Sequence, residues 1–134
     1  MNKISLINNN QLSSIKKFID DNINEFYFFK KIGWTINNIE SQFNKDNNYS
    51  LGFYEANNLA GILIGDTIKN DRDYDLELHI LFVSKASRRK QIATKLLNYV
   101  ETNNIYFSKI FTEVAKNNVE AISFYKKNNF VFLN

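Results

Sequence analysis

The sequence of 134 residues contains no cysteine and no proline, and it has only four glycines and one histidine. Without cysteine the chain can form neither a disulfide nor a thiolate metal site, and a single histidine rules out a metal site built from several histidines. We therefore expect no metal cofactor. Asparagine, isoleucine and lysine are abundant, which is typical of compositional drift in an AT-rich genome, so asparagine can stand where glycine would be expected.

Long hydrophobic runs are also missing. No stretch is apolar for long enough to span a bilayer, and the N-terminal MNKISLINNN lacks the apolar centre of a signal peptide. We expect a cytoplasmic protein with no membrane partner. The length, together with 44% apolar and 23% charged residues, indicates one folded domain over residues 1–134.

The positive charge is modest and local. The net charge is +3 and the pI is near 9.0. The clearest basic cluster consists of Lys85, Arg88, Arg89, Lys90 and Lys95. It suffices for one polyphosphate but is small for a nucleic-acid duplex, because duplex-binding proteins spread Lys and Arg along a whole face. We expect no nucleic-acid partner.

The chain is organised around residues 76–97, LELHILFVSKASRRKQIATKLL. Apolar residues alternate along 76–83, which predicts a strand, and from Ile92 they follow the helical period. A strand, a basic loop and a helix N-terminus form a ready anion site, because unpaired backbone N–H groups and the positive end of the helix dipole point at the ligand. We interpret this loop as the site of a phosphate-bearing cofactor.

The rest of the chain predicts a mixed α/β sheet, in which an antiparallel meander leads into the 76–97 unit and parallel strands flank its helix. The expected strands cover residues 3–7, 49–56, 59–68, 76–83, 109–114 and 130–133. The expected helices cover residues 11–21, 36–43, 92 to about 103, and 119–128. Thr35 and Asn118 are the expected N-caps, and Asn57-Asn58 is the expected hairpin turn.

Two motifs near the C-terminus are the most specific signals in the sequence. The first is RRKQIA at residues 88–93, and the second runs from Glu113-Val114 through Asn118, Ala121-Ile122 and Tyr125 to Asn129-Phe130. They resemble Arg/Gln-x-x-Gly-x-Gly/Ala and Glu-Val-x-x-x-Asn-x-x-Ala-Ile-x-x-Tyr-x-x-x-Gly-Phe of the GNAT-type N-acetyltransferase superfamily. Upstream, Gly33-Trp34-Thr35 resembles a Pro-Trp-Ser segment of the same enzymes. The sequence is most similar to the bacterial members that acetylate the N-terminal alanine of a ribosomal protein.

The resemblance implies a GNAT-like acyl-CoA N-acyltransferase fold, with a central mixed sheet flanked by helices and shortened C-terminal strands. It also implies transfer of an acetyl group from acetyl-CoA to a primary amine, either the N-terminus of a protein such as a ribosomal protein or a small-molecule amine. The residues it assigns to acetyl-CoA are Leu81, Phe82, Val83, Arg88, Arg89, Lys90, Gln91, Ile92, Ala93, Thr94, Asn118 and Tyr125.

Three residues match catalytic positions of these enzymes. Tyr125 resembles the acid that protonates the departing CoA thiolate, and a phenol stays protonated at neutral pH. Glu113 matches the base of the alanine-acetylating enzymes, whereas Glu77 matches a strand glutamate that histone-type relatives use as base. The choice between the two glutamates stays open, since each could also be a solvated strand residue. His79 is interpreted as a packed or partnered histidine and is not assigned a role.

The sequence departs from the superfamily pattern at four points, and three of them (Gln91, Ala115 and the early end of the chain) favour an alternative function. Gln91 stands at the motif glycine, where its backbone N–H can still donate if its φ is negative. Asn129 also replaces a glycine, Ala115 replaces an arginine, and the chain stops at Asn134 where relatives continue with two strands. The alternative is a catalytically weak or inactive acyl-CoA-binding or protein-interaction domain. We further expect a homodimer that covers the open sheet edge.

Overall fold

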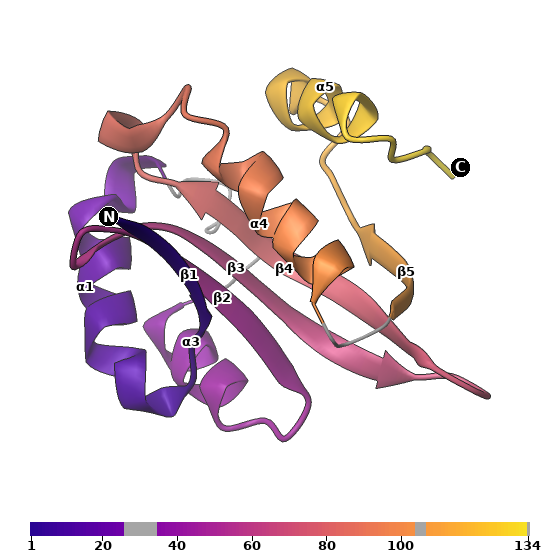
Figure 1. The fold of residues 1–134 in the computed structure, drawn as a ribbon, viewed down its shortest axis with the longest axis horizontal. Coiled ribbons are helices and arrows are strands. Elements are labelled where there is room, and N and C mark those ends of the chain that lie inside the picture. The colour runs from indigo at the N-terminus through magenta and orange to yellow at the C-terminus, as the bar shows by residue number, and fades with distance from the viewer. Residues whose placement is uncertain (26–34, 104–106, 134) are drawn as a thin grey trace.

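The computed structural model describes residues 1–25, 35–103 and 107–133, which form one sheet with helices on both faces (Figure 1). The strands are β1 (Asn2–Leu6), β2 (Asn48–Glu55), β3 (Asn58–Lys69), β4 (Tyr74–Val83) and β5 (Phe107–Thr112). The helices are α1 (Leu12–Asp21), α3 (Ile36–Phe43), α4 (Ile92–Thr102) and α5 (Val119–Lys127), with short 3-10 turns at Asn9–Gln11, Ile23–Glu25 and Lys85–Ser87.

The sheet has the strand order β1-β2-β3-β4-β5. The first four strands form an antiparallel meander, and β5 runs parallel to β4 after the α4 crossover. This is the mixed sheet that the sequence predicts. A parallel neighbour needs a crossover connection, which explains why a helix separates β4 from β5 in the chain.

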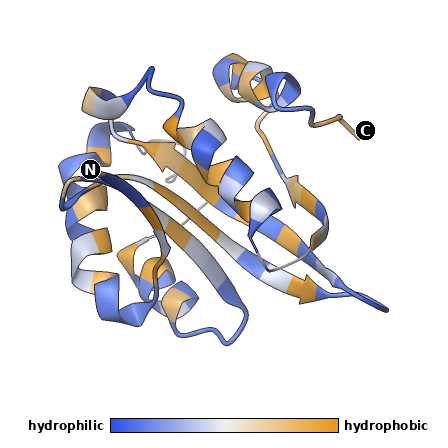
Figure 2. Cartoon of the chain, in the orientation of Figure 1, coloured by the Kyte–Doolittle hydropathy of each residue, from blue (hydrophilic) through white to orange (hydrophobic). Residues whose placement is uncertain are grey.

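Two apolar cores lie on opposite faces of the sheet, and the hydropathy pattern follows them (Figure 2). On one face, Ile92, Leu96, Leu97 and Val100 of α4 pack against Leu51, Leu63, Leu76 and Leu78 of the strands. On the other face, Ile15, Phe18 and Ile19 of α1 and Ile39 and Phe43 of α3 pack against Ile62, Ile64 and Ile80. The two cores fix the helices relative to the strand ends where the cleft described below opens.

The helix starts match the predicted caps. Thr35 is the N-cap of α3, and its backbone N–H donates to Asn38 Oδ1 at 2.7 Å. Asn118 is the N-cap of α5, where its Oδ1 accepts from the Ala121 N–H at 3.2 Å. Asn129 ends α5 with a left-handed φ of 71°. Each of these residues supplies the polar atom or the backbone angle that a helix end requires.

Two predicted elements differ from the structure. The β2–β3 turn lies at residues 56–57, because Glu55 pairs with Asn58 and so draws Asn58 into the strand. Ala56 takes the left-handed φ of 54° there, and its N–H donates to Met1 O at 3.0 Å.

Residues 130–133 do not form the expected strand. The Phe130 N–H instead donates to Tyr125 O and closes the end of α5. The side chains of Val131 and Leu133 are 81% and 91% exposed. Without a neighbouring strand in the described part of the chain, this apolar segment has no ladder to join.

Part of the sequence analysis cannot be compared with the structure. The aromatic run at residues 26–29 and the Gly33-Trp34 pair fall outside the described residues. Among the helices that the structure describes, none combines the length and the apolar character needed to cross a bilayer.

The packing of α4 gives a stability prediction. Leu96 is completely buried between α4 and the sheet, so Leu96→Ala should lower the free energy of unfolding by about 2–5 kcal/mol through lost burial and a residual cavity. Urea unfolding followed by circular dichroism measures this. Val119→Ala is the control, because the Val119 side chain is 72% exposed and should change stability by less than about 0.5 kcal/mol. Equal effects of the two substitutions would contradict the packing described here.

Candidate active site

A cleft opens where β4 and β5 part. The two strands pair from Tyr74 opposite Phe107 to Leu78 opposite Thr112, after which β5 ends. β4 continues to Val83 while paired with β3 alone, so beyond Leu78 its other edge has no strand partner among the described residues (Figure 1). The cleft has a volume of about 930 Å³, and its walls are the end of β4, the start of α4, the chain after β5 and one side of α5.

The predicted cofactor residues of β4 lie on this free edge. Leu81, Phe82 and Val83 all line the cleft. An unpaired strand edge offers backbone N–H and C=O groups to an extended ligand in the way that a neighbouring strand would. One of these acceptors already has a donor, because Arg88 Nε binds Val83 O at 3.2 Å.

A β-bulge in β4 borders the same cleft. Ile64 pairs with Ile80 and Gly65 with Leu78, so His79 is the extra residue of β4. Gly65 is required opposite the bulge, since a Cβ there would lie 2.5 Å from Glu77 O. The bulge changes which side chains face which core, because Leu78 packs on the α4 side while Ile80 packs on the α1 and α3 side. Bulges of this kind re-aim side chains beside active sites, and His79 lines the cleft.

Helix α4 presents an uncapped N-terminus to the cleft. Its N-cap is Gln91, whose side chain makes no capping hydrogen bond, and Ile92, Ala93 and Thr94 of the first turn line the cleft. The N–H groups of a first helical turn have no acceptor within the helix, and the helix dipole adds positive potential there. A helix terminus of this kind can hold an anion, which is the chemistry that the sequence predicts for this loop.

The backbone of Gln91 differs from the expectation. Its φ is 59°, a left-handed angle, and not the negative angle that a glutamine prefers. Arg89 in the same loop also has a left-handed φ of 68°. For a residue with a Cβ this conformation costs roughly 1–2 kcal/mol, which explains why the superfamily motif has glycine at the position of Gln91.

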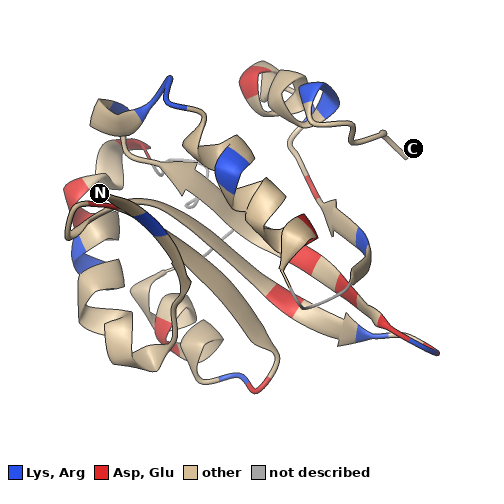
Figure 3. Cartoon of the chain, viewed as in Figure 1, with Lys and Arg blue, Asp and Glu red and all other residues tan. Residues whose placement is uncertain are grey.

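The three cationic side chains of the loop before α4 face different surroundings. Arg88 and Arg89 line the cleft, and Arg88 also contacts Glu25 Oε2 at 3.4 Å. Lys90 instead binds Glu55 Oε2 at 2.7 Å, and the Ser87 hydroxyl donates to the other oxygen of the same carboxylate. Lys90 and Ser87 together hold the pKa of Glu55 below its usual value. Positive charge gathers in the loop before α4 (Figure 3), but Lys90 fastens the loop to β2 and does not face the cleft.

Tyr125 lies on the opposite wall of the cleft, on α5. Its ring packs edge-on against Phe124 and Phe130, with centroid distances of 5.2 and 5.0 Å. Burial raises the pKa of Tyr125 to about 12, and the neighbouring Thr112 hydroxyl partly offsets that rise. The phenol is therefore protonated throughout the physiological pH range. Asn118, at the start of the same helix, also lines the cleft.

The two glutamates predicted as bases differ in position. Glu113 follows the last residue of β5, is exposed and lines the cleft. Glu77 lies on β4 before the bulge, and its carboxylate belongs to a cluster with Asp66 and His79 whose ligand atoms all lie within 4.8 Å of one another. The structure thus brings Glu113 and Tyr125 to one cleft and places Glu77 next to Asp66 and His79.

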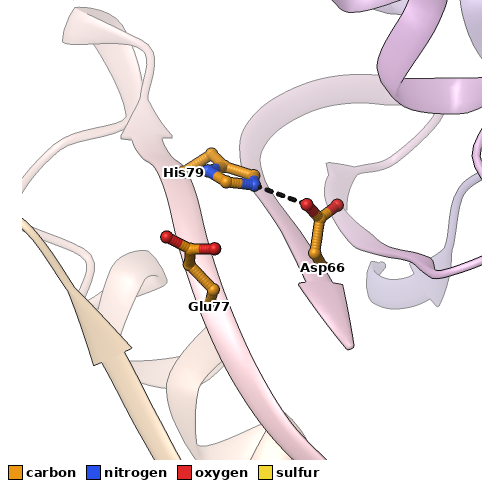
Figure 4. A group of neighbouring side chains, drawn as sticks. All are labelled: Asp66, Glu77 and His79. Carbon is orange, nitrogen blue, oxygen red and sulfur yellow. Dashed lines mark hydrogen bonds and ion pairs between the residues drawn. The ribbon is translucent and has the colours of Figure 1, made fainter. Parts of the chain in front are cut away.

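Asp66 and His79 form a polar pair beside the cleft, and the sequence analysis assigned neither of them a role (Figure 4). His79 Nε2 lies 2.9 Å from Asp66 Oδ2. The two residues are 13 positions apart on neighbouring strands. The bulge that orients His79 cannot be predicted from the spacing of the apolar residues in β4. The cluster with Glu77 is the one group in the described residues with the spacing of a metal site. The Asp66 oxygens already accept hydrogen bonds from Gln42, Lys45 and His79, so we interpret the cluster as a hydrogen-bond network.

Comparison with known proteins agrees with this geometry. The family model described as "Acetyltransferase (GNAT) family" matches residues 15–130. The chain belongs to the GNAT acetyltransferase family. The family prediction made from the two sequence motifs is therefore confirmed, and with it the assignment as an N-acetyltransferase. No curated protein sequence matches this GNAT chain.

Solved structures show the same fold for the whole GNAT chain. A possible acetyltransferase from Clostridium difficile 630 superposes with a TM-score of 0.79 at 18% identity, covering 100% of this chain and 93% of that one. The aminoglycoside N-acetyltransferase AAC(6')-Iy in complex with CoA gives 0.76 at 14% identity, covering 100% and 90%. The ribosomal-protein-alanine N-acetyltransferase of Brucella melitensis biovar Abortus 2308 gives 0.70 at 14% identity, covering 96% and 90%. These likenesses confirm the predicted GNAT fold.

The strained backbone at Gln91 gives a second prediction. Gln91→Gly should raise the free energy of unfolding by up to about 1 kcal/mol, because glycine adopts the left-handed angle without a steric cost. The matched control is Lys95→Gly, an exposed position inside α4, which should lower it by about 1 kcal/mol. Urea unfolding of both variants measures the difference. A loss of stability at both positions would mean that Gln91 does not have the left-handed angle.

Proposed function

We propose that the protein transfers the acetyl group of acetyl-CoA to a primary amine, and that the acceptor is the N-terminal amine of a protein. The observation that carries this proposal is the free edge of β4 lying next to the uncapped N-terminus of α4 in one cleft. The strand edge suits an extended amide-containing chain, and the helix end suits a pyrophosphate. Acetyl-CoA contains both groups in a single molecule.

The cleft residues fit the two parts of the co-substrate. For the pyrophosphate, the backbone N–H groups at Ala93 and Thr94 would donate, and Arg88 and Arg89 would supply charge. For the pantetheine arm, the backbone of Leu81 to Val83 would bind on one side. Asn118 on the α5 wall lies within the same cleft and can contact the arm with the part of its amide that does not cap the helix.

Tyr125 is suited to the role of acid in this reaction. In acetyl transfer the lone pair of the acceptor nitrogen attacks the thioester carbonyl carbon, the C–S bond breaks, and the thiolate takes up a proton. A buried phenol whose pKa is about 12 is always protonated at neutral pH and can donate to the leaving sulfur. Of the two predicted bases, Glu113 shares the cleft with Tyr125, whereas Glu77 would act through an intervening group.

The proposal that the acceptor is an amine is supported by acidic side chains around the cleft. Glu25, Glu113 and Glu120 put carboxylates on the cleft wall, and these would attract any protonated amine, whether a peptide N-terminus or an aminoglycoside. A panel of an alanine-initiated peptide, the aminoglycoside sisomicin and simple alkylamines separates protein from small-molecule acceptors. Turnover of sisomicin alone would reject the protein N-terminus as the acceptor.

We also propose that a second copy of the chain pairs with the edge strand β5. Analytical ultracentrifugation tests this proposal, and a monomer would reject it.

Calorimetry and turnover together test the proposed function. Acetyl-CoA should bind with one site per chain, and Tyr125→Phe should reduce kcat by about 10²- to 10⁴-fold while leaving acetyl-CoA affinity unchanged, because the phenol acts on the leaving sulfur. Tyr99→Phe is the matched control, since Tyr99 lies on α4 away from the cleft wall.

The two possible failures have different meanings. Absence of acetyl-CoA binding would reject the proposed function outright. Binding without turnover of any acceptor would favour the alternative of an inactive acyl-CoA-binding domain, for which the strained Gln91 is the structural argument.

A further inference from the structure

One carboxylate that lies off the cleft wall holds the loop that leads into α4. Glu55 is the last residue of β2. Its Oε1 accepts a hydrogen bond from the Ser87 hydroxyl at 2.5 Å, and its Oε2 accepts one from Lys90 Nζ at 2.7 Å. Lys90 and Ser87 keep the pKa of Glu55 below its usual value, so the carboxylate is ionised at neutral pH and accepts from both. Glu55, Ser87 and Lys90 are not among the residues that line the cleft.

The same loop is also attached to the sheet at each end. At its start, the Ser84 N–H donates to Ala60 O on β3 at 2.9 Å. At its end, Ile92 is 2% exposed and packs over Gly61, where an added Cβ would lie 2.9 Å from Ile92 Cγ2. Glu55 therefore binds the part of the loop that lies between two fixed ends.

The middle of the loop has a strained backbone. Arg89 and Gln91 have left-handed φ angles of 68° and 59°, and Lys90 lies between them. Such angles are unfavourable for a residue with a Cβ, and they persist only where the surrounding contacts enforce them. Ser87 lies just before this stretch and Lys90 within it. One carboxylate thus holds the strained stretch at two points.

From these contacts we propose that Glu55 is a positioning residue for acetyl-CoA, which keeps the loop in the conformation that turns Arg88, Arg89 and the N-terminus of α4 to the cleft. The inference rests on the proposed function and adds a residue of β2 that lies outside both sequence motifs. It also gives Lys90 a different role from the predicted one, because Lys90 acts through Glu55 and not on the pyrophosphate. A glycine at position 91 would adopt the left-handed angle without this support.

Positioning and charge predict opposite effects of Glu55 on binding. Acetyl-CoA is a polyanion, and the Glu55 carboxylate adds negative charge near the loop. If charge alone mattered, its removal would tighten binding and free Lys90 to attract the phosphates. If Glu55 positions the loop, its removal weakens binding, because the apparent Kd rises as the fraction of molecules in the binding conformation falls.

Calorimetry with acetyl-CoA decides between the two effects. Glu55→Gln keeps the size of the side chain but replaces one accepting oxygen with an amide group that only donates. The Kd for acetyl-CoA should rise about tenfold, and kcat at saturating acetyl-CoA should stay within about twofold of wild type, because the reacting groups are untouched. Glu40→Gln is the matched control, since it removes the Lys16–Glu40 ion pair between α1 and α3, and it should leave the Kd unchanged. Equal or tighter binding by Glu55→Gln would overturn the inference.

A rescue experiment tests whether the effect passes through the loop backbone. In a Gln91→Gly background the left-handed angle has no steric cost, so Glu55→Gln should raise the Kd by about threefold or less. The four proteins form a double-mutant cycle, in which coupling shows that the two residues act on the same conformation. The same tenfold loss in both backgrounds would mean that Glu55 does not support the angle of Gln91.

Amide exchange of the free protein tests the positioning without any ligand. The Lys95 N–H donates to Gln91 O at 2.9 Å, so its exchange reports whether Gln91 keeps its place at the start of α4. Exchange at Lys95 should be faster in Glu55→Gln than in wild type and unchanged in Glu40→Gln. An equal rate in Glu55→Gln and wild type would overturn the inference.

The failure of the inference is distinguishable from that of the proposed function. If wild type and Glu55→Gln bind acetyl-CoA equally well, Glu55 has no positioning role and the proposed function stands. If wild type does not bind acetyl-CoA, the proposed function is wrong, and the role of Glu55 is rejected with it. Thermal unfolding separates a displaced loop from a lost fold, because loss of a partly exposed ion pair should change the Tm by only a few degrees.

Discussion

The parting of β4 from β5 is the constraint on which the rest of this structure depends. The two strands share a ladder only as far as Leu78 and Thr112, and beyond that point β3 is the one strand that pairs with β4 in the part of the chain that the structure describes. The exposed edge of a strand offers its backbone N–H and C=O groups to a ligand or to another chain. Because α4 begins and α5 returns at the same end of the sheet, the free edge, an uncapped helix terminus and Tyr125 face one another across a single cleft.

Packing on both faces of the sheet keeps this opening in place. The α4 core fixes the helix terminus over β4, and the core under α1 and α3 supports the other face. Between the two cores, the bulge at His79 reverses the face of β4, so that Leu78 points into the α4 core and Ile80 into the core under α1 and α3. The same irregularity turns His79 to the cleft while Asp66 is held from behind by Gln42 and Lys45.

Local signals predicted what is local in this molecule. Apolar periodicity located α4, the Asn118 cap located α5, and the motif contains Glu113 and Tyr125, which line one cleft. Each of these features depends on residues close in sequence. The sequence did not predict contacts that depend on strand register. These include the His79–Asp66 pair and the attachment of Lys90 to Glu55. The left-handed angle of Gln91 was not predicted either, because glutamine rarely adopts it. In β4 both sets of alternating positions contain apolar residues, so the change of face at the bulge is not visible in the sequence.

The measurement that tests the central claim most directly is backbone amide hydrogen exchange with and without acetyl-CoA. If the co-substrate pairs with the free edge of β4 and the terminus of α4, exchange at residues 79–83 and 91–94 should slow on binding. Amides of β1 and β2, far from the cleft, should exchange at the same rate in both states. Protection that spares both β4 and the start of α4 while acetyl-CoA is bound would contradict the account.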